Sequence, residues 1–198
     1  AGAQYFSTYV LGNQGINSIL FVCLVAPSII VVPLWAKVAN RLGKKRGYLL
    51  SSLCFLAGTL LLLSARVVPL AASLAFVALC GIGYAGMQMF PLSMLPDAIA
   101  VDAAESGKRR AGAYTGFWTA GETTGFAIGP ALVLALLGVS GFVSSTANEV
   151  VVQPESAING TLLVVTVLPA LLLLASLPLL LRYDLTDDHI AATLGDTA

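Results

Sequence analysis

Charged residues are scarce in this chain of 198 residues. They make up only 10% of it, against about 25% in an average soluble domain, while hydrophobic residues make up 58%. Too few polar side chains remain to cover the surface of a soluble core. The basic and acidic residues cancel to a net charge of zero, so the sequence points to no nucleic-acid partner. The scarcity of charge predicts an integral membrane protein.

Motifs for metal binding and redox chemistry are also missing. The single histidine, His189, lies near the end of the chain, where no histidine relay is available to it. The three cysteines, Cys23, Cys54 and Cys80, lie in apolar stretches, without a CxxC pair or a nearby histidine. Cysteines in such positions are typical of helix packing. We therefore expect no metal site and no cofactor.

Five apolar stretches are each long enough to cross a bilayer, which takes about 20 helical residues. An aromatic segment at the start, which ends at Gly12, resembles the second half of a sixth span and indicates a fragment. We expect an all-α membrane bundle over residues 1–182 and a cytoplasmic tail over 183–198. The expected spans are 1–14 (partial), 16–36, 47–65, 69–96, 111–139 and 160–182.

Basic residues alternate sharply between the loops that join these spans. Arg66 alone falls on one side of the membrane. The positive-inside rule makes the opposite side cytoplasmic. This predicts a multi-pass protein of the plasma (inner) membrane whose C-terminus is cytoplasmic. The bases on the predicted cytoplasmic side are Lys37, Arg41, Lys44, Lys45, Arg46, Lys108, Arg109, Arg110 and Arg182.

Glu122 is the one ionisable residue deep within a predicted span. Burial of a charge at the middle of a bilayer costs about 2.5–3.5 kcal/mol on insertion scales, so such residues usually face a polar cavity or a partner. We predict that Glu122 contacts a transported solute or a proton. The alternative is a protonated or hydrogen-bonded glutamate with a structural role.

Polar and aromatic side chains accompany Glu122 at helical spacing. Tyr114 and Trp118 precede it by two turns and one turn, and Thr119 and Thr123 form a neighbouring row. Aromatic rings can stack on sugars, and hydroxyls and amides can bond solute hydroxyls; the alternative is hydrogen bonding between helices. With two residues four apart on the preceding span, the predicted solute-binding residues are Tyr84, Gln88, Tyr114, Trp118, Thr119, Glu122 and Thr123.

Small residues recur within two of the spans. Residues 81–86 match the pattern GxGxxG, but a dinucleotide site needs a strand before the glycines, and these lie in mid-span. We interpret them as positions where helix backbones approach closely. Two further rows at four-residue spacing predict tight helix contact or a mobile interface: Gly112, Gly116 and Ala120, then Gly121, Gly125 and Gly129.

Three acids and three bases crowd into residues 97–110, between two apolar spans. Such a segment must lie in water at a membrane face. Its acids, Asp97, Asp102 and Glu105, could hold Mg²⁺ and a diphosphate in a membrane-embedded transferase. Their spacing fits no usual motif of those enzymes, and a second acidic cluster is lacking. We therefore expect no enzyme; a non-catalytic membrane subunit is a further alternative.

Two segments resemble a known family. Residues 33–46 (PLWAKVANRLGKKR) are similar to the basic loop motif of the major facilitator superfamily, with Ala36 and Asn40 in place of its first Gly and its Asp. Residues 91–112 follow the pattern PxSMxPDx₄Dx₄GxRRxG. That pattern resembles the link between the tenth and eleventh helices of the glycoside–pentoside–hexuronide:cation symporters. Residues 5–12 resemble the end of the seventh helix of that family.

The resemblance implies the C-terminal six-helix half of a twelve-helix transporter. Such a protein moves a sugar, glycoside or similar small polar solute by alternating access, coupled to Na⁺ or H⁺. It implies three partners: the lipid bilayer, the solute and the N-terminal half of the same polypeptide. That half supplies most of the residues that bind the coupling ion. An exporter or a lysolipid carrier on the same fold is the alternative.

The resemblance also implies a cytoplasmic gate, in which ion pairs hold the inner side shut and exchange partners as the halves rock. The alternative is a solvated loop that only sets orientation. Many relatives have a lysine at or beside Thr123; this chain has none there, which argues against a standard galactoside pocket. The predicted gate residues are Arg41, Asp97, Asp102, Arg109 and Arg110.

Overall fold

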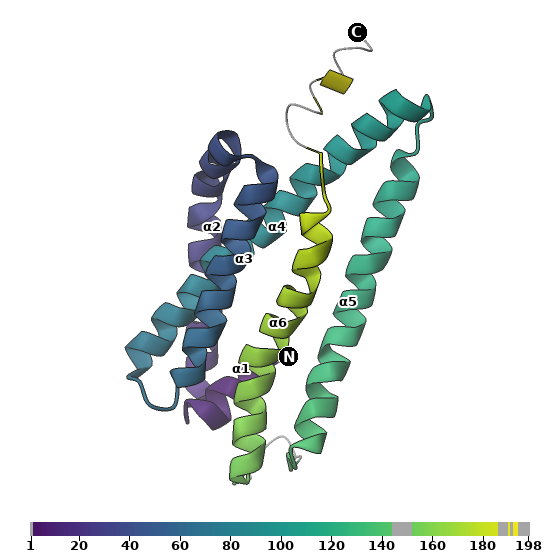
Figure 1. Cartoon of the computed structure of the whole chain (residues 1–198). Helices are drawn as coiled ribbons and strands as arrows, with labels where there is room; N and C mark the ends of the chain where they lie inside the picture. The colour runs from purple at the N-terminus through teal and green to yellow at the C-terminus, as the bar shows by residue number, and fades with distance from the viewer. Residues whose placement is uncertain (1, 144–151, 186–189, 191, 194–198) are drawn as a thin grey trace.

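The protein is a bundle of long helices (Figure 1). The computed structural model describes residues 2–143, 152–185, 190 and 192–193, and no strand occurs among them. Five of its helices are long and apolar enough to cross a membrane, which confirms the all-α membrane fold. They are α2 (Asn17–Leu42), α3 (Lys44–Leu61), α4 (Leu70–Ser106), α5 (Ala111–Val139) and α6 (Glu155–Leu181).

Shorter helical segments surround these five. The chain starts with α1 (Gly2–Tyr5), which runs into the π-helix η1 (Phe6–Val10). Two 3₁₀ turns, η2 (Gln14–Ile16) and η3 (Leu62–Ser64), precede α2 and follow α3. Most of the predicted tail, 183–198, lies outside the described residues, and so does His189.

Helix α4 continues beyond the end of the predicted membrane span. The expected span ended near residue 96 and a water-exposed link was expected to follow, but the helix continues to Ser106. Several alanines favour helix in this stretch, and the helix ends at Gly107, whose φ of 66° is the left-handed conformation common at helix C-termini. Asp97 and Asp102 therefore lie on a helix, and only residues 107–110 form the link to α5.

The glycines of α4 let it pack directly against two neighbours. A Cβ atom at Gly81 would overlap the backbone of Leu24 in α2, and one at Gly83 would overlap the backbone of Phe55 in α3. Small residues at such positions allow helix backbones to approach closely, which supplies much of the attraction between helices in a membrane. The interpretation of GxGxxG as a packing motif is confirmed.

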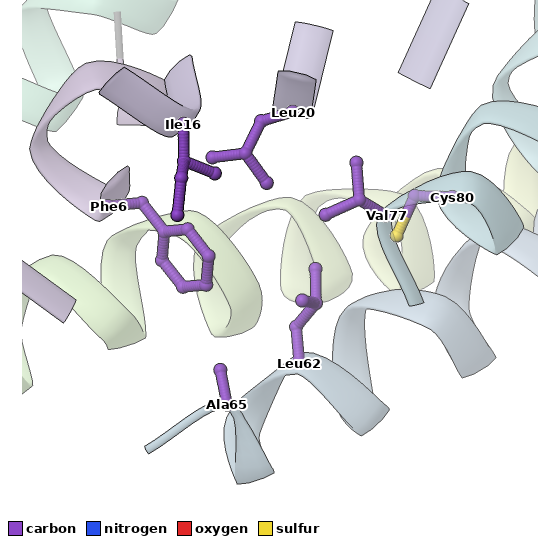
Figure 2. Packing of buried hydrophobic residues seen from close by; sticks show 7 residues of the cluster. All are labelled: Phe6, Ile16, Leu20, Leu62, Ala65, Val77 and Cys80. Atoms are coloured by element: carbon purple, nitrogen blue, oxygen red, sulfur yellow. The ribbon is translucent and has the colours of Figure 1, made fainter. Parts of the chain in front are cut away.

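Two buried apolar clusters hold the α2–α4 unit together. The first joins the chain start to one end of α2, α3 and α4, and Figure 2 shows its side chains converging: Phe6, Ile16, Leu20, Leu62, Ala65, Val77 and Cys80. The second lies toward the start of α3 and contains Val31, Trp35, Ala85, Phe90 and Met94. Leu180 and Tyr183 at the end of α6 pack on this second cluster.

Helix α5 stands apart from the other helices along most of its length (Figure 1). Leu137 is its only buried residue in the described structure. Beyond its end, the Phe142 ring lies edge-on to Tyr5 and Tyr9, with centroids 5.2 and 5.3 Å apart. A Cβ atom added to any glycine of α5 would meet nothing within 4 Å. The glycines of the two predicted small-residue rows are therefore not closely packed against the described part of the chain.

Replacement of glycine by alanine should have different effects in the closely packed helix α4 and in the open helix α5. Alanine is the better helix former by about 1 kcal/mol, so Gly138→Ala in α5 should leave stability unchanged or raise it. Gly83→Ala should instead lower stability by about 1–3 kcal/mol, because its methyl group overlaps α3. Thermal unfolding in detergent micelles measures both. Equal effects of the two substitutions would contradict the close packing of α4 and α3.

Candidate gate and solute-binding surface

The start of α3 carries three consecutive bases, Lys44, Lys45 and Arg46. Positive charge is unfavourable at a helix N-terminus, where the helix dipole is itself positive. Gly43, at φ 80°, makes the tight turn that joins α2 to this helix. Bases at this unfavourable position need acceptors close by, and Lys44 and Lys45 have them.

Lys44 pairs with Asp97 of α4. Its Nζ donates to the Asp97 carboxylate and, at 3.3 Å, to the backbone oxygen of Ser93. The Lys44 side chain is 30% exposed and that of Asp97 is 19% exposed, so the pair is only partly screened by solvent. This contact joins α3 to α4 at the point where α4 leaves the predicted membrane span.

Lys45 binds the end of α6 instead. Its Nζ donates to the backbone oxygens of Leu181, at 2.9 Å, and Tyr183, at 2.6 Å. It also lies 4.0 Å from a carboxylate oxygen of Asp184. A cation at a helix C-terminus satisfies carbonyls that have no intrahelical donor. The start of α3 is thus the junction of α3, α4 and α6.

The predicted gate residues are only partly brought together. Arg110 Nη2 donates to Asp102 Oδ1 at 3.0 Å, so these two predicted gate residues are in contact. Arg41 and Arg109 are exposed and form no ion pair within the described residues. Because Asp97 pairs with Lys44 and Asp102 with Arg110, bases occupy two of the three carboxylates considered for a metal site in a transferase. Their role as a gate stays a prediction.

Lys44 was missed as a partner of Asp97 by sequence reasoning. The sequence placed Lys44 in the basic loop motif and among the predicted cytoplasmic bases. The available signal was the single acid that directly follows a predicted span, opposite a run of bases on the same side of the membrane. That signal predicts that a base contacts the acid, but it does not predict which of the bases does so.

Tyr84 and Gln88 form a polar pair on the exposed side of α4. Gln88 Nε2 donates to Tyr84 Oη at 2.8 Å. Tyr84 also lines a cavity of about 780 Å³. That cavity is mainly apolar, with Phe6, Leu20 and Val77 in its wall.

The threonines of α5 line a separate, very shallow groove along that one helix. Thr123 donates its hydroxyl hydrogen to the Thr119 carbonyl oxygen at 2.7 Å. Its oxygen therefore remains available to accept a hydrogen bond from a solute. The groove is lined by Gly112, Thr115, Gly116, Thr119, Ala120, Thr123 and Thr124.

The remaining predicted solute residues lie outside both cavities. Glu122, Trp118 and Tyr114 occupy an adjacent face of α5, as helical spacing requires. Glu122 is exposed and makes no ion pair with the residues described. The structure therefore places the Tyr84–Gln88 pair and the polar faces of α5 on different surfaces and does not join them into one pocket.

The chain matches a known family over nearly its whole length. Residues 1–187 fit the family described as MFS/sugar transport protein, where MFS is the major facilitator superfamily. The chain belongs to this family. The match confirms the predicted resemblance and places the chain among membrane transporters, not enzymes.

Two relatives are similar to this member of the superfamily. It is 31% identical over 186 residues to an uncharacterized symporter of Synechocystis sp., which covers 92% of the chain and 34% of the relative. It is 26% identical over 188 residues to a glucuronide carrier protein homolog of Escherichia coli, which covers 94% of the chain and 40% of the relative. The chain thus spans well under half the length of these relatives. No solved structure matches it.

Removal of either partner of the Lys44–Asp97 pair should destabilise the protein. Asp97→Asn leaves a partly buried ammonium without its counter-charge, although the Ser93 oxygen still accepts from it, at a cost of about 1–2 kcal/mol. Lys44→Gln should cost a similar amount, and the double variant should be no worse than either single one. Thermal unfolding in detergent measures all three.

Asp184 supplies the matched control. It is 93% exposed and 4.0 Å from Lys45, so Asp184→Asn should change stability by less than about 0.5 kcal/mol. Strictly additive losses in the Lys44–Asp97 double variant would show that the two side chains do not interact.

Proposed function

We propose that this chain is the C-terminal half of a secondary transporter that takes up a sugar, a glycoside or a similar small polar solute. The observation that carries the proposal is α5, a membrane-length helix with an exposed glutamate and an exposed threonine row. The glutamate does not belong against lipid, because a charge at bilayer depth needs a polar environment. A water-filled solute pathway along α5 supplies one.

The solute class and the coupling are inferred from the relatives. One of them is named a glucuronide carrier homolog, which makes glucuronides and other glycosides the first solutes to consider. The other is named a symporter, which supports coupling to an ion, Na⁺ or H⁺. The polar groups at hand are hydroxyls, amides, aromatic rings and one carboxylate, and these groups bind sugar hydroxyls.

A second half of the transporter would complete the site. The relatives are more than twice the length of the region they share with this chain. We assign that extra length to an N-terminal six-helix half that faces α5 and encloses the solute. This half would supply most of the residues that bind the coupling ion. The lipid bilayer surrounds both halves. The protein then crosses the plasma membrane many times and has a cytoplasmic C-terminus.

The start of α3 would serve as part of the inner gate. Asp97 and Asp102 are acids held on a helix at the predicted cytoplasmic face, with Lys44 and Arg110 as resident partners. Bases from the other half could compete for the same acids as the two halves close. Such an exchange would keep Asp97 and Asp102 paired with a base while the gate changes between its two states.

Ion movement that depends on solute tests the proposal directly. The full-length protein is placed in proteoliposomes with an imposed Na⁺ or H⁺ gradient and screened against sugars, glycosides and glucuronides. We expect uptake of one solute class that requires one of the two ions, and flux of that ion only when the solute is present. Absence of flux with every solute and both ions would favour an exporter or a lysolipid carrier.

Glu122 should be essential to that uptake. Glu122→Gln keeps the size of the side chain but removes its charge, so uptake should fall at least about tenfold if the carboxylate binds solute or proton. Glu105→Gln is the matched control, since Glu105 is an exposed glutamate near the end of α4. Unchanged uptake and unchanged pH dependence in Glu122→Gln would remove Glu122 from the site.

A further inference from the structure

The Tyr84–Gln88 pair stands on the one side of α4 that other helices leave open. Gly81 and Gly83 touch the backbones of α2 and α3, and a Cβ atom at Gly86 would overlap the side chain of Ser51. Tyr84 and Gln88 are exposed on the other side of the same two turns. The direction of these two side chains therefore depends on how the buried side of α4 packs against α2 and α3.

Trp35 of α2 contacts the buried side of α4. It is 8% exposed, and its Nε1 donates to the backbone oxygen of Ile82 at 2.9 Å. Its ring lies edge-on to Phe90, with centroids 5.8 Å apart. A Cβ atom at Gly86 would lie 3.0 Å from Trp35 Cε2, so the indole also covers this glycine. Among the described residues, this is the only side-chain hydrogen bond between α2 and α4.

Helix α4 is intrinsically weak near this level. The glycines at 81, 83 and 86 are weak helix formers, and Pro91 has no amide hydrogen to offer the Met87 carbonyl one turn earlier. Apolar packing gains little in a bilayer, because lipid is as apolar as the neighbouring helix, so a hydrogen bond between helices carries more of the orientation.

We propose that Trp35 is a positioning residue that sets the direction of the Tyr84–Gln88 pair through the Ile82 carbonyl. It acts on solute affinity without touching the solute. The inference rests on the proposed function in one respect: that Gln88 contacts the transported solute. The indole and the pair lie on opposite sides of α4, and the backbone of residues 82–88 connects them.

A double-mutant cycle on transport tests the coupling. Uptake of p-nitrophenyl β-D-glucuronide by the full-length protein is measured for Trp35→Phe, Gln88→Ala and the double variant. Trp35→Phe keeps an aromatic ring, although a smaller one, and loses the Nε1 donor. It should raise KM about three- to tenfold with little change in maximal rate. The double variant should have the KM of Gln88→Ala alone, because Trp35 acts through that side chain.

Cys54→Ala supplies the matched control. It removes another side-chain hydrogen bond to the α4 backbone, from Cys54 Sγ to the Leu79 oxygen at 3.6 Å, one turn away from the pair. Its KM should match that of the unaltered protein. Multiplied effects of Trp35→Phe and Gln88→Ala, or an unchanged KM in Trp35→Phe when Gln88→Ala raises it, would overturn the proposal.

Hydrogen exchange separates this inference from the proposed function. If the unaltered protein does not transport the glucuronide, the solute assignment fails, and amide exchange over residues 81–90 then decides the role of Trp35. Trp35→Phe should speed exchange there by about three- to tenfold, and Cys54→Ala should not. Equal exchange in Trp35→Phe and the unaltered protein would show that Trp35 does not hold α4.

Discussion

The contact on which the rest of this structure depends is the close packing of α4 between α2 and α3. In a bilayer, apolar side chains gain little by leaving lipid, so helices associate through short backbone approaches and hydrogen bonds. Gly81 and Gly83 provide those approaches. Once α4 is seated, Trp35 reaches the Ile82 carbonyl and Lys44 reaches Asp97. The polar pair on α4 and the ion pair at the predicted gate are both placed by this one packing arrangement.

The start of α3 concentrates a different kind of constraint. Three bases at a helix N-terminus are unfavourable beside the positive end of the helix dipole. Contacts of two of these bases with other helices offset that cost. Lys44 goes to a carboxylate of α4, and Lys45 goes to the terminal carbonyls of α6. Adjacent residues on one helix thus bind two different helices. A movement of α3 during transport would change both contacts together.

Helix α5 shows what the described part of the chain leaves open. Its small residues, its threonines and Glu122 touch almost nothing, although its length and composition suit a membrane. A polar face at bilayer depth is costly against lipid but useful beside a solute pathway. In the proposed transporter, a second half would cover that face.

Composition, charge alternation and two motifs were sufficient to predict a membrane protein, its five long helices and its family. Those properties depend on transfer to lipid and on local patterns, which the sequence contains directly. The tertiary structure alone decided that Asp97 pairs with Lys44, that α4 runs on to Ser106, and that Tyr84 lies on a different surface from the threonines of α5. These outcomes depend on where glycine contacts set the helices relative to one another, and no spacing within a single helix encodes that placement.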